Sequence, residues 1–417
     1  PGLLRAAEAR GRAPGEPQEA PGPPEAQRAL LHPMYVMKVS DALELSRIEP
    51  HQAVQRQAKV VEFQEGMLVA FVSHQWLGRA HPDAGLRQFR ALQAALRNLA
   101  LGLPVAQCPS GCPRPEAAPL TAECAQALVA SGYLWYDYFS VPQLAAAGAP
   151  KAELEDFRNA VSSLPAYVQR SRWFFALAPD VEHEEKPCQL GLGTWLSRGW
   201  CRLELAAQAL SEREEEAPIF TITGECEVTE GRPYLWVHAQ PAHGDFALES
   251  DRRCVARVMS DLLDARGEAS RLQGDFFTAR FLQAMRAHAE CNGAVSSERL
   301  STWLAIFEFR EPLRERANGW APVHYAALEG NTKVLDALLA AGEDVGRPTT
   351  GSAVHVRATK GMTPFMIAMA YIPKGPAADR MAAYFAQRGS EAGQEAASAG
   401  VEAAHSVGRF LPPLWSL

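Results

Sequence analysis

The sequence predicts an α/β domain with a mostly parallel sheet in its first half and an all-α module near its C-terminus. Between about residues 66 and 245, short apolar runs of strand length alternate with segments whose apolar residues recur every three or four positions. Strands separated by helices favour a parallel sheet covered on both faces. From residue 246 the helical spacing continues without strand-like runs. This predicts a helical connector over residues 246–316 and an all-α module over residues 317–388.

Five runs, each rich in apolar, β-branched or aromatic residues, account for the predicted sheet. Their short length and composition are typical of strands that are buried or half-buried. They are Met67–Ser73, Tyr133–Phe139, Trp173–Ala178, Pro218–Thr223 and Tyr234–His238.

Amphipathic helices are expected between and after these runs. Asp83 follows a proline and is a candidate N-cap for the first of them. Pro165 is expected to bend or end the second, and residues 102–120, rich in Pro, Gly and Cys, are expected to form a loop. The predicted helices cover about residues 86–99, 154–168, 199–210, 255–263, 276–289 and 300–309.

The two ends of the chain differ from its centre. Ten of the first 24 residues are Pro or Gly, a composition that favours disorder over residues 1–30. Residues 31–65 are predicted to hold one or two short lead-in helices, broken near Pro50. Residues 389–417 are predicted to be a flexible tail.

The bulk composition favours a globular protein with an acidic surface. Of 417 residues, 47% are hydrophobic and 21% charged, and the formal net charge is −7. Nucleic-acid binders concentrate Lys and Arg on one face, and the sequence has no such cluster, so we expect no nucleic-acid partner. No apolar run has the length that a membrane-spanning helix needs, so we expect no membrane partner and a cytoplasmic location.

Eight cysteines are scattered along the chain, a density far below that of disulfide scaffolds, so we expect reduced intracellular thiols. Cys108, Cys112 and Cys124 could be proposed as zinc ligands. No second pair follows at the spacing of a zinc finger. A loop with incidental thiols is the favoured interpretation, and no metal site is predicted.

Polar and aromatic side chains follow the predicted strands. Ser73, His74 and Trp76 come at the end of the first strand, Asp137 in the second, and Asp180 after the third. Open parallel sheets bind ligands at the C-terminal ends of their strands. The sequence therefore predicts a pocket at this edge, although His74 could equally be a turn residue with its hydrogen bonds satisfied locally.

Residues 318–345, NGWAPVHYAALEGNTKVLDALLAAGEDV, resemble the ankyrin repeat over their whole length. The turn before Pro322, the Ala-Ala pair, Gly330 and the Leu-Leu pair stand at the expected offsets. Ala321 replaces the usual Thr, which removes a side-chain hydrogen bond from the turn. A second start at Gly361 lies 42 residues after Gly319 rather than 33, so an insertion is expected between the repeats. The resemblance implies a protein partner, although so short an array could instead cap the helical connector.

The segment SRGWCRLEL, residues 197–205, follows a helix ending in Ser and an apolar strand. This order resembles the Toll/interleukin-receptor (TIR) domain, in which Trp-Cys-x-x-Glu-Leu stands at this place. The matching positions are Trp200, Cys201, Glu204 and Leu205. The resemblance covers about residues 66–240 and implies a flavodoxin-like parallel sheet.

The segment YLWYDYFSVPQ, residues 133–143, resembles fungal heterokaryon-incompatibility (HET) domains, which look related to TIR domains. Trp135, Asp137 and Gln143 are the matching positions, with Ser140 where a Cys is usual. Two features depart from the TIR pattern: the opening turn SHQWLGRAHPD carries fewer acidic residues, and the loop at 102–120 is longer.

The TIR resemblance implies one of two activities. Some TIR domains cleave NAD at the nicotinamide–ribose bond with the Glu of this motif, which makes Glu204 the candidate catalytic residue and NAD a candidate substrate rather than a cofactor. Ser73, His74, Trp76, Asp137 and Trp200 are then expected to line the pocket. Other TIR domains assemble as signalling adaptors, which here implies a non-enzymatic signalling or scaffolding protein that self-associates through this domain. In that case Glu204 could simply favour a helix N-terminus or pair with Arg198 or Arg202.

Overall fold

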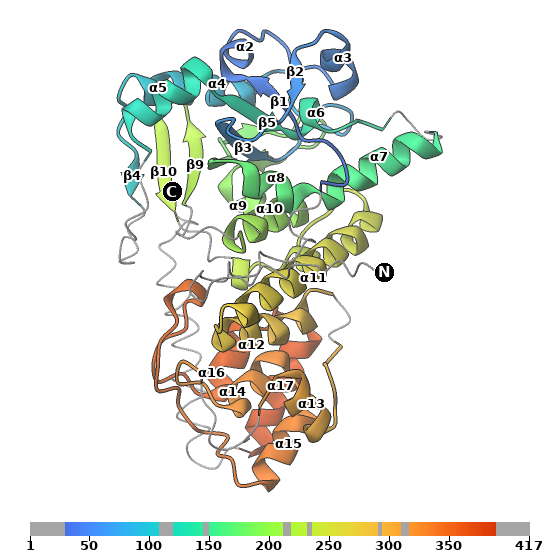
Figure 1. The fold of residues 1–417 in the computed structure, drawn as a ribbon, viewed down its shortest axis with the longest axis vertical. Helices are drawn as coiled ribbons and strands as arrows, with labels where there is room; N and C mark the ends of the chain where they lie inside the picture. The colour runs from blue at the N-terminus through green and yellow to red at the C-terminus, as the bar shows by residue number, and fades with distance from the viewer. Residues whose placement is uncertain are drawn as a thin grey trace, which may run out of the picture.

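The computed structural model describes residues 30–107, 120–144, 150–211, 218–231, 236–290, 294–309 and 317–388. The predicted disorder of residues 1–29, the flexible tail at 389–417, and Cys108 and Cys112 lie outside these residues. Figure 1 shows the sheet in its upper half and the all-α part in its lower half, with helix α11 (Glu249–Leu272) running between them.

Within the described residues, the main sheet has eight strands in the order β2-β1-β5-β3-β6-β9-β10-β4. At its centre β3 pairs in parallel with β5 and β6, and β6 pairs in parallel with β9. All six residues of β3 are buried, as expected for a strand covered on both faces. The strands are β1 (Tyr35–Lys38), β2 (Val60–Glu62), β3 (Val69–His74), β4 (Ala106–Gln107), β5 (Tyr133–Tyr136), β6 (Trp173–Leu177), β9 (Ile219–Gly224) and β10 (Glu227–Gly231).

Helices cover both faces of this sheet. On one face α4 (Arg87–Ala100) and α5 (Ala122–Ser131) pack against alternate strand residues such as Ala70 and Val72. On the other face α8 (Leu164–Arg170) and α10 (Gly199–Ala209) pack against Phe71 and Phe174. The predicted α/β architecture with a parallel centre is confirmed.

One predicted N-cap is wrong in detail, and one predicted helix break is confirmed. The N-cap position of α4 is Leu86 rather than Asp83, but the Asp83 carboxylate still accepts hydrogen bonds from the backbone N–H groups of Arg87 (2.7 Å) and Phe89 (2.8 Å) in the first turn. The second predicted helix is broken into α7 (Lys151–Ser162) and α8, with Pro165 in the first turn of α8.

Three predictions about the sheet are wrong. Residues 31–65 form not only the short helices α2 (Val39–Leu43) and α3 (His51–Arg56) but also β1 and β2. These two strands extend the sheet beyond β5 with antiparallel pairing, and β2 is the edge strand. The run at Tyr133–Phe139 leaves the sheet after Tyr136, and α6 (Asp137–Ser140) follows as a single turn. Trp236–His238 is helical or turn-like rather than a strand, and the fifth run's place is taken by β10, which pairs with β9 as a hairpin.

The C-terminal half is helical, as predicted. The connector holds α11, α12 (Phe276–Met285) and α13 (Leu300–Ile306). Two helix pairs follow, α14 (Pro322–Glu329) with α15 (Thr332–Ala340) and α16 (Pro364–Tyr371) with α17 (Pro376–Arg388). Helix α12 packs on α14 and α14 on α16, while α13 packs on α15. The connector therefore supplies the stacking neighbour that a two-pair array lacks.

The turns that precede α14 and α16 differ in their caps, as the sequence predicts. Thr363 caps α16 by accepting a hydrogen bond from the Met366 N–H, whereas Ala321 makes no side-chain cap for α14.

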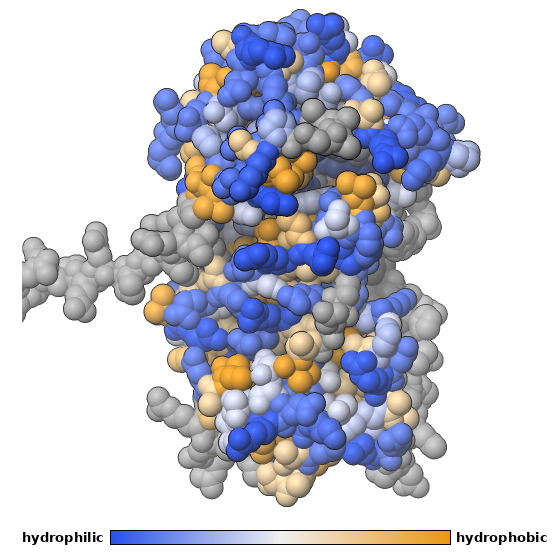
Figure 2. All heavy atoms as spheres, turned by 90° about the vertical axis from the view of Figure 1, so that its right-hand side faces the viewer, coloured by the Kyte–Doolittle hydropathy of each residue, from blue (hydrophilic) through white to orange (hydrophobic). Residues whose placement is uncertain are grey.

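The surface in Figure 2 is mainly hydrophilic on the face it shows, with hydrophobic side chains in small separate groups. Over the part of the chain that the structure describes, no helix is both long and apolar enough to cross a lipid bilayer.

Candidate functional site

Side chains from three elements meet at the C-terminal end of β3. The crossover from β3 to β5 runs through α4 and α5 on one face of the sheet, and the crossover from β5 to β6 runs through α7 and α8 on the other. A change of face of this kind opens a crevice beyond the strand ends, where α/β proteins bind ligands. Ser73 and His74 end β3, Asp137 follows β5, and Glu204 reaches the same place from α10.

Ser73 joins the strand end to α10. Its hydroxyl donates to Oε2 of Glu204 at 2.5 Å, a short hydrogen bond between two buried side chains. The indole Nε1–H of Trp195 donates to the same Ser73 hydroxyl at 3.0 Å. Trp195 is 1% exposed and lies on α9 (Leu192–Ser197). The three side chains form a continuous chain of hydrogen bonds from α9 through β3 to α10.

The environment of Glu204 favours its neutral form. Burial is the largest cause, and it raises the pKa of Glu204 to about 8, with a smaller contribution in the same direction from the negative charge of Asp137. The hydrogen bond from Ser73 works in the opposite direction, because a donor stabilises the carboxylate. At neutral pH most of the Glu204 carboxyl is therefore protonated.

Asp137 is held by two donors from β3 and its following turn. His74 Nε2 lies 2.7 Å from Oδ1, and the Trp76 indole N–H donates to Oδ2 at 2.8 Å. The Tyr136 hydroxyl lies 3.2 Å from His74 Nδ1, and the two rings stack with centroids 3.9 Å apart. His74 is thus both part of the site and fully partnered, so the two interpretations of this residue are compatible.

Asp137 remains ionised, in contrast to Glu204. Burial works to raise the pKa of Asp137, but the adjacent His74 and the hydrogen bonds from His74 and Trp76 outweigh it, so the pKa of Asp137 lies below its ordinary value. The Asp137 side chain is 32% exposed, so a ligand can reach it from solvent. The site thus combines a neutral buried carboxyl with a charged accessible one, a division typical of acid–base sites.

Two other residues of the segment SRGWCRLEL have other hydrogen-bond partners. The indole N–H of Trp200 donates to Asp251 of α11 at 3.2 Å, so Trp200 does not join the Ser73–Glu204 pair. The thiol of Cys201 is buried and lies 3.5 Å from the backbone oxygen of His74. Burial, with a smaller effect of Glu204, raises the pKa of Cys201 well above its ordinary value, which leaves it a poor nucleophile.

The segment YLWYDYFSVPQ, residues 133–143, shapes the turn that carries Asp137. The Ser140 hydroxyl accepts from the Tyr136 N–H at 3.2 Å, and the Gln143 side chain donates to the backbone oxygens of Asp137 (3.3 Å) and Val141 (2.9 Å). These bonds fix the backbone around Asp137. Trp135, by contrast, lies in the core and stacks on Phe71 with ring centroids 4.2 Å apart.

The N-terminus of α10 is anchored by the segment before α11. The Gly199 N–H donates to the backbone oxygen of Asp245 at 3.0 Å, and a β-carbon at Gly199 would lie 2.0 Å from the ring of Phe246. Arg202 donates to the backbone oxygens of Leu196 and Gln240 at 2.7 and 3.3 Å, and Glu204 instead bonds Ser73. The helix that carries Glu204 is therefore fixed at both its start and its centre.

Sequence reasoning missed Trp195 and Tyr136. Nothing in their spacing distinguishes an aromatic residue of the core from one whose polar atom faces a site. A tryptophan five residues before Trp200 in GLGTWLSRGW was the one available signal.

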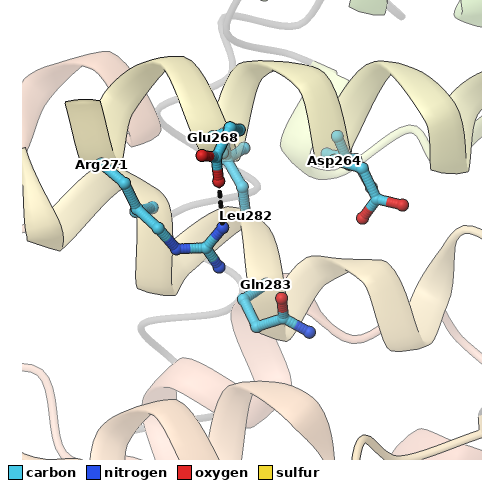
Figure 3. A pocket seen from close by; sticks show the side chains of 8 residues that line it. Asp264, Glu268, Arg271, Leu282 and Gln283 are labelled. Carbon is cyan, nitrogen blue, oxygen red and sulfur yellow. Dashed lines mark hydrogen bonds and ion pairs between the residues drawn. The ribbon is translucent and has the colours of Figure 1, made fainter. Parts of the chain in front are cut away.

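The described residues contain no group of three or more His, Cys, Asp or Glu placed to hold a metal ion. A surface hollow of about 270 Å³ lies between α11 and α12 (Figure 3). Its charged side chains already pair with neighbours, Arg271 with Glu268 at 3.1 Å and Asp264 with Arg286 at 3.0 Å. It contains none of the strand-end residues.

Comparisons with known proteins identify one part of the chain. The ankyrin-repeat family model matches residues 318–350. This segment is an ankyrin repeat. Repeats of this family are protein-interaction modules, so its presence implies a protein partner. No match to a TIR or HET family is found, and no curated protein and no solved structure matches the chain.

Proposed function

We propose that the α/β domain is TIR-like and hydrolyses NAD at the nicotinamide–ribose bond, with Glu204 as its catalytic carboxylate. The observation that carries the proposal is the hydrogen bond from Ser73, at the end of the central strand β3, to Glu204, with Asp137 nearby, directly after the neighbouring strand β5. The order β5-β3-β6-β9 of the four parallel strands supports a flavodoxin-like arrangement, in which such a strand end is a ligand site.

The chemistry needs few groups. Nicotinamide leaves as a neutral pyridine, so its departure requires no general acid. The transition state resembles an oxocarbenium ion, which a nearby carboxylate stabilises. Water then adds to the anomeric carbon and loses a proton to the ionised form of Glu204. Because the pKa of Glu204 is about 8, this form is the minor one at neutral pH, and the rate should rise as the pH increases from 7 to 9. Asp137, charged and accessible, is suited to accept a hydrogen bond from a ribose hydroxyl, and Trp76 offers a partly exposed aromatic ring.

The test is nicotinamide release from NAD by the purified chain, at high protein concentration so that assembly can occur. Glu204→Gln keeps the shape of the carboxyl and removes its charge. Glu230→Gln is a matched control: Glu230 is also buried in the sheet, but it pairs with Phe220 near the start of β9, away from the strand ends. We expect release that Glu204→Gln abolishes and Glu230→Gln retains. Release that survives Glu204→Gln would exclude Glu204 as the catalytic group.

A second candidate is a non-enzymatic scaffold that self-associates through the α/β domain. The observation in its favour is that Glu204 is only 9% exposed, so the carboxyl has little access to a ligand in this conformation. Absence of nicotinamide release from the folded protein, with concentration-dependent assembly in analytical ultracentrifugation, would favour this function. In both cases the ankyrin repeat provides for a protein partner.

A further inference from the structure

The indole of Trp195 constrains the hydrogen bonds of Ser73. The indole nitrogen of Trp195 is a donor and cannot accept, so at 3.0 Å the Ser73 oxygen must accept from it. The hydroxyl proton of Ser73 can then point to its other neighbour, Oε2 of Glu204 at 2.5 Å. An ionised Glu204 can only accept this bond, whereas a protonated Glu204 can also donate to the second lone pair of the serine oxygen. Ser73 and Trp195 therefore support the ionised form of Glu204 in particular.

We propose that Ser73 and Trp195 are positioning residues for Glu204: the indole orients the serine hydroxyl, and the hydroxyl holds the carboxyl at the end of β3. This assigns Ser73 to Glu204 rather than to a ligand, and it adds Trp195 to the site. It rests on the proposed function for its catalytic meaning, but the hydrogen-bonded unit is testable without any substrate.

The supports of this unit are rigid. Ser73 is 0% exposed and lies opposite Ala176 in the parallel β3–β6 ladder, so its backbone is fixed by the sheet. The indole of Trp195 is enclosed in the core. Cys201, one turn before Glu204, contacts the His74 backbone and ties α10 to the same strand end. A carboxyl that lost its donor here would be buried without a replacement partner, which is costly.

The first experiment is an infrared pH titration of the carboxyl band of Glu204, identified by its loss in Glu204→Gln. A hydrogen bond to a charged group contributes about 1.5–3 kcal/mol, so Ser73→Ala should raise the pKa of Glu204 by about one to two units. Trp195→Phe should raise it by less, because the hydroxyl remains but loses its orienting donor. The matched control is Trp135→Phe, since the buried Trp135 indole N–H has no acceptor among the described residues, and we expect no change.

An unchanged or lowered pKa in Ser73→Ala would overturn the proposal, as would an equal effect of Trp195→Phe and Trp135→Phe. If Ser73→Ala does not fold, the comparison of the two tryptophan variants decides alone. In the nicotinamide assay, the positioning role predicts that Ser73→Ala and Trp195→Phe lower kcat and leave KM unchanged. The acidic side of their pH–rate profile should move to higher pH. If the wild type releases no nicotinamide, the proposed catalytic function fails, and the titration still decides whether the two residues hold Glu204.

Discussion

Replacing Glu204 by Gln should stabilise the fold increasingly as the pH rises from 5 to 8. The pKa of Glu204 is about 8 in the folded chain, against an ordinary value of 4.5 that applies when the chain is unfolded. Between these values the folded state holds a proton that the unfolded state has released. The free energy of unfolding of the wild type must then fall as the pH rises through this window.

The size of the effect follows from the shift. One pKa unit corresponds to about 1.4 kcal/mol, so three units of pH between 5 and 8 give up to about 4 kcal/mol for this single group. Gln mimics the protonated carboxyl and does not titrate, so it removes this term. Its amide oxygen can still accept the hydrogen bond from Ser73.

The assay is urea unfolding of both proteins at several pH values from 5 to 9, with the slope on denaturant checked to be equal. We expect the variant to be near the wild type in stability at pH 5 and more stable by several kcal/mol at pH 8, with little further change above. A stability difference that is constant across this range would refute the conclusion that Glu204 is buried in a protonated state.

Three further predictions concern the framework around the site. Gly199→Ala should destabilise the chain by about 1–3 kcal/mol, because the new β-carbon would overlap the Phe246 ring. Gly267→Ala is the control: it lies in a helix with open space at the β-carbon and should stabilise the chain by about 0.5–1 kcal/mol. Equal melting temperatures of the two variants would contradict this prediction. Glu329→Ala should cost about 2–4 kcal/mol in urea unfolding, because its buried carboxylate accepts three hydrogen bonds: one from Trp303 of α13, one from the Ser296 N–H before α13, and one from Asn331 within the ankyrin repeat. A loss below 1 kcal/mol would contradict this. Burial lowers the pKa of His288 to about 4, so its contribution to stability, complete above pH 6.5, should be lost by up to about 3 kcal/mol as the pH falls toward 4, and His288→Gln should flatten this part of the pH–stability curve.

Local patterns in the sequence were sufficient for much of the fold. The runs at Met67–Ser73 and Trp173–Ala178 predicted β3 and β6 because a strand buried on both faces must be apolar at every position. The ankyrin repeat could be recognised in the sequence because its turns and helix ends need particular residues at fixed positions. Gly330, for example, ends α14 with φ of +77°, a conformation that favours glycine.

The short strands β1 and β2 were harder to predict for a physical reason. Strand β1 is four residues long and β2 three, and the pairing of β1 with β2 and with β5 depends on backbone hydrogen bonds rather than on a side-chain pattern. The same limit applies to the Tyr133–Phe139 run, in which composition predicted a longer strand and the backbone turns at Asp137 into α6.

By itself, the sequence determined the α/β and all-α halves, the ankyrin repeat and the residue types available at the strand ends. Only the tertiary structure decided that Ser73 meets Glu204, since 131 positions separate them in the chain. It also decided that Trp195 joins them while Trp200 turns to α11. The opposite pKa shifts of Glu204 and Asp137 belong to the fold as well, because burial and neighbouring charges, not residue type, set the free energy of an ionised carboxylate.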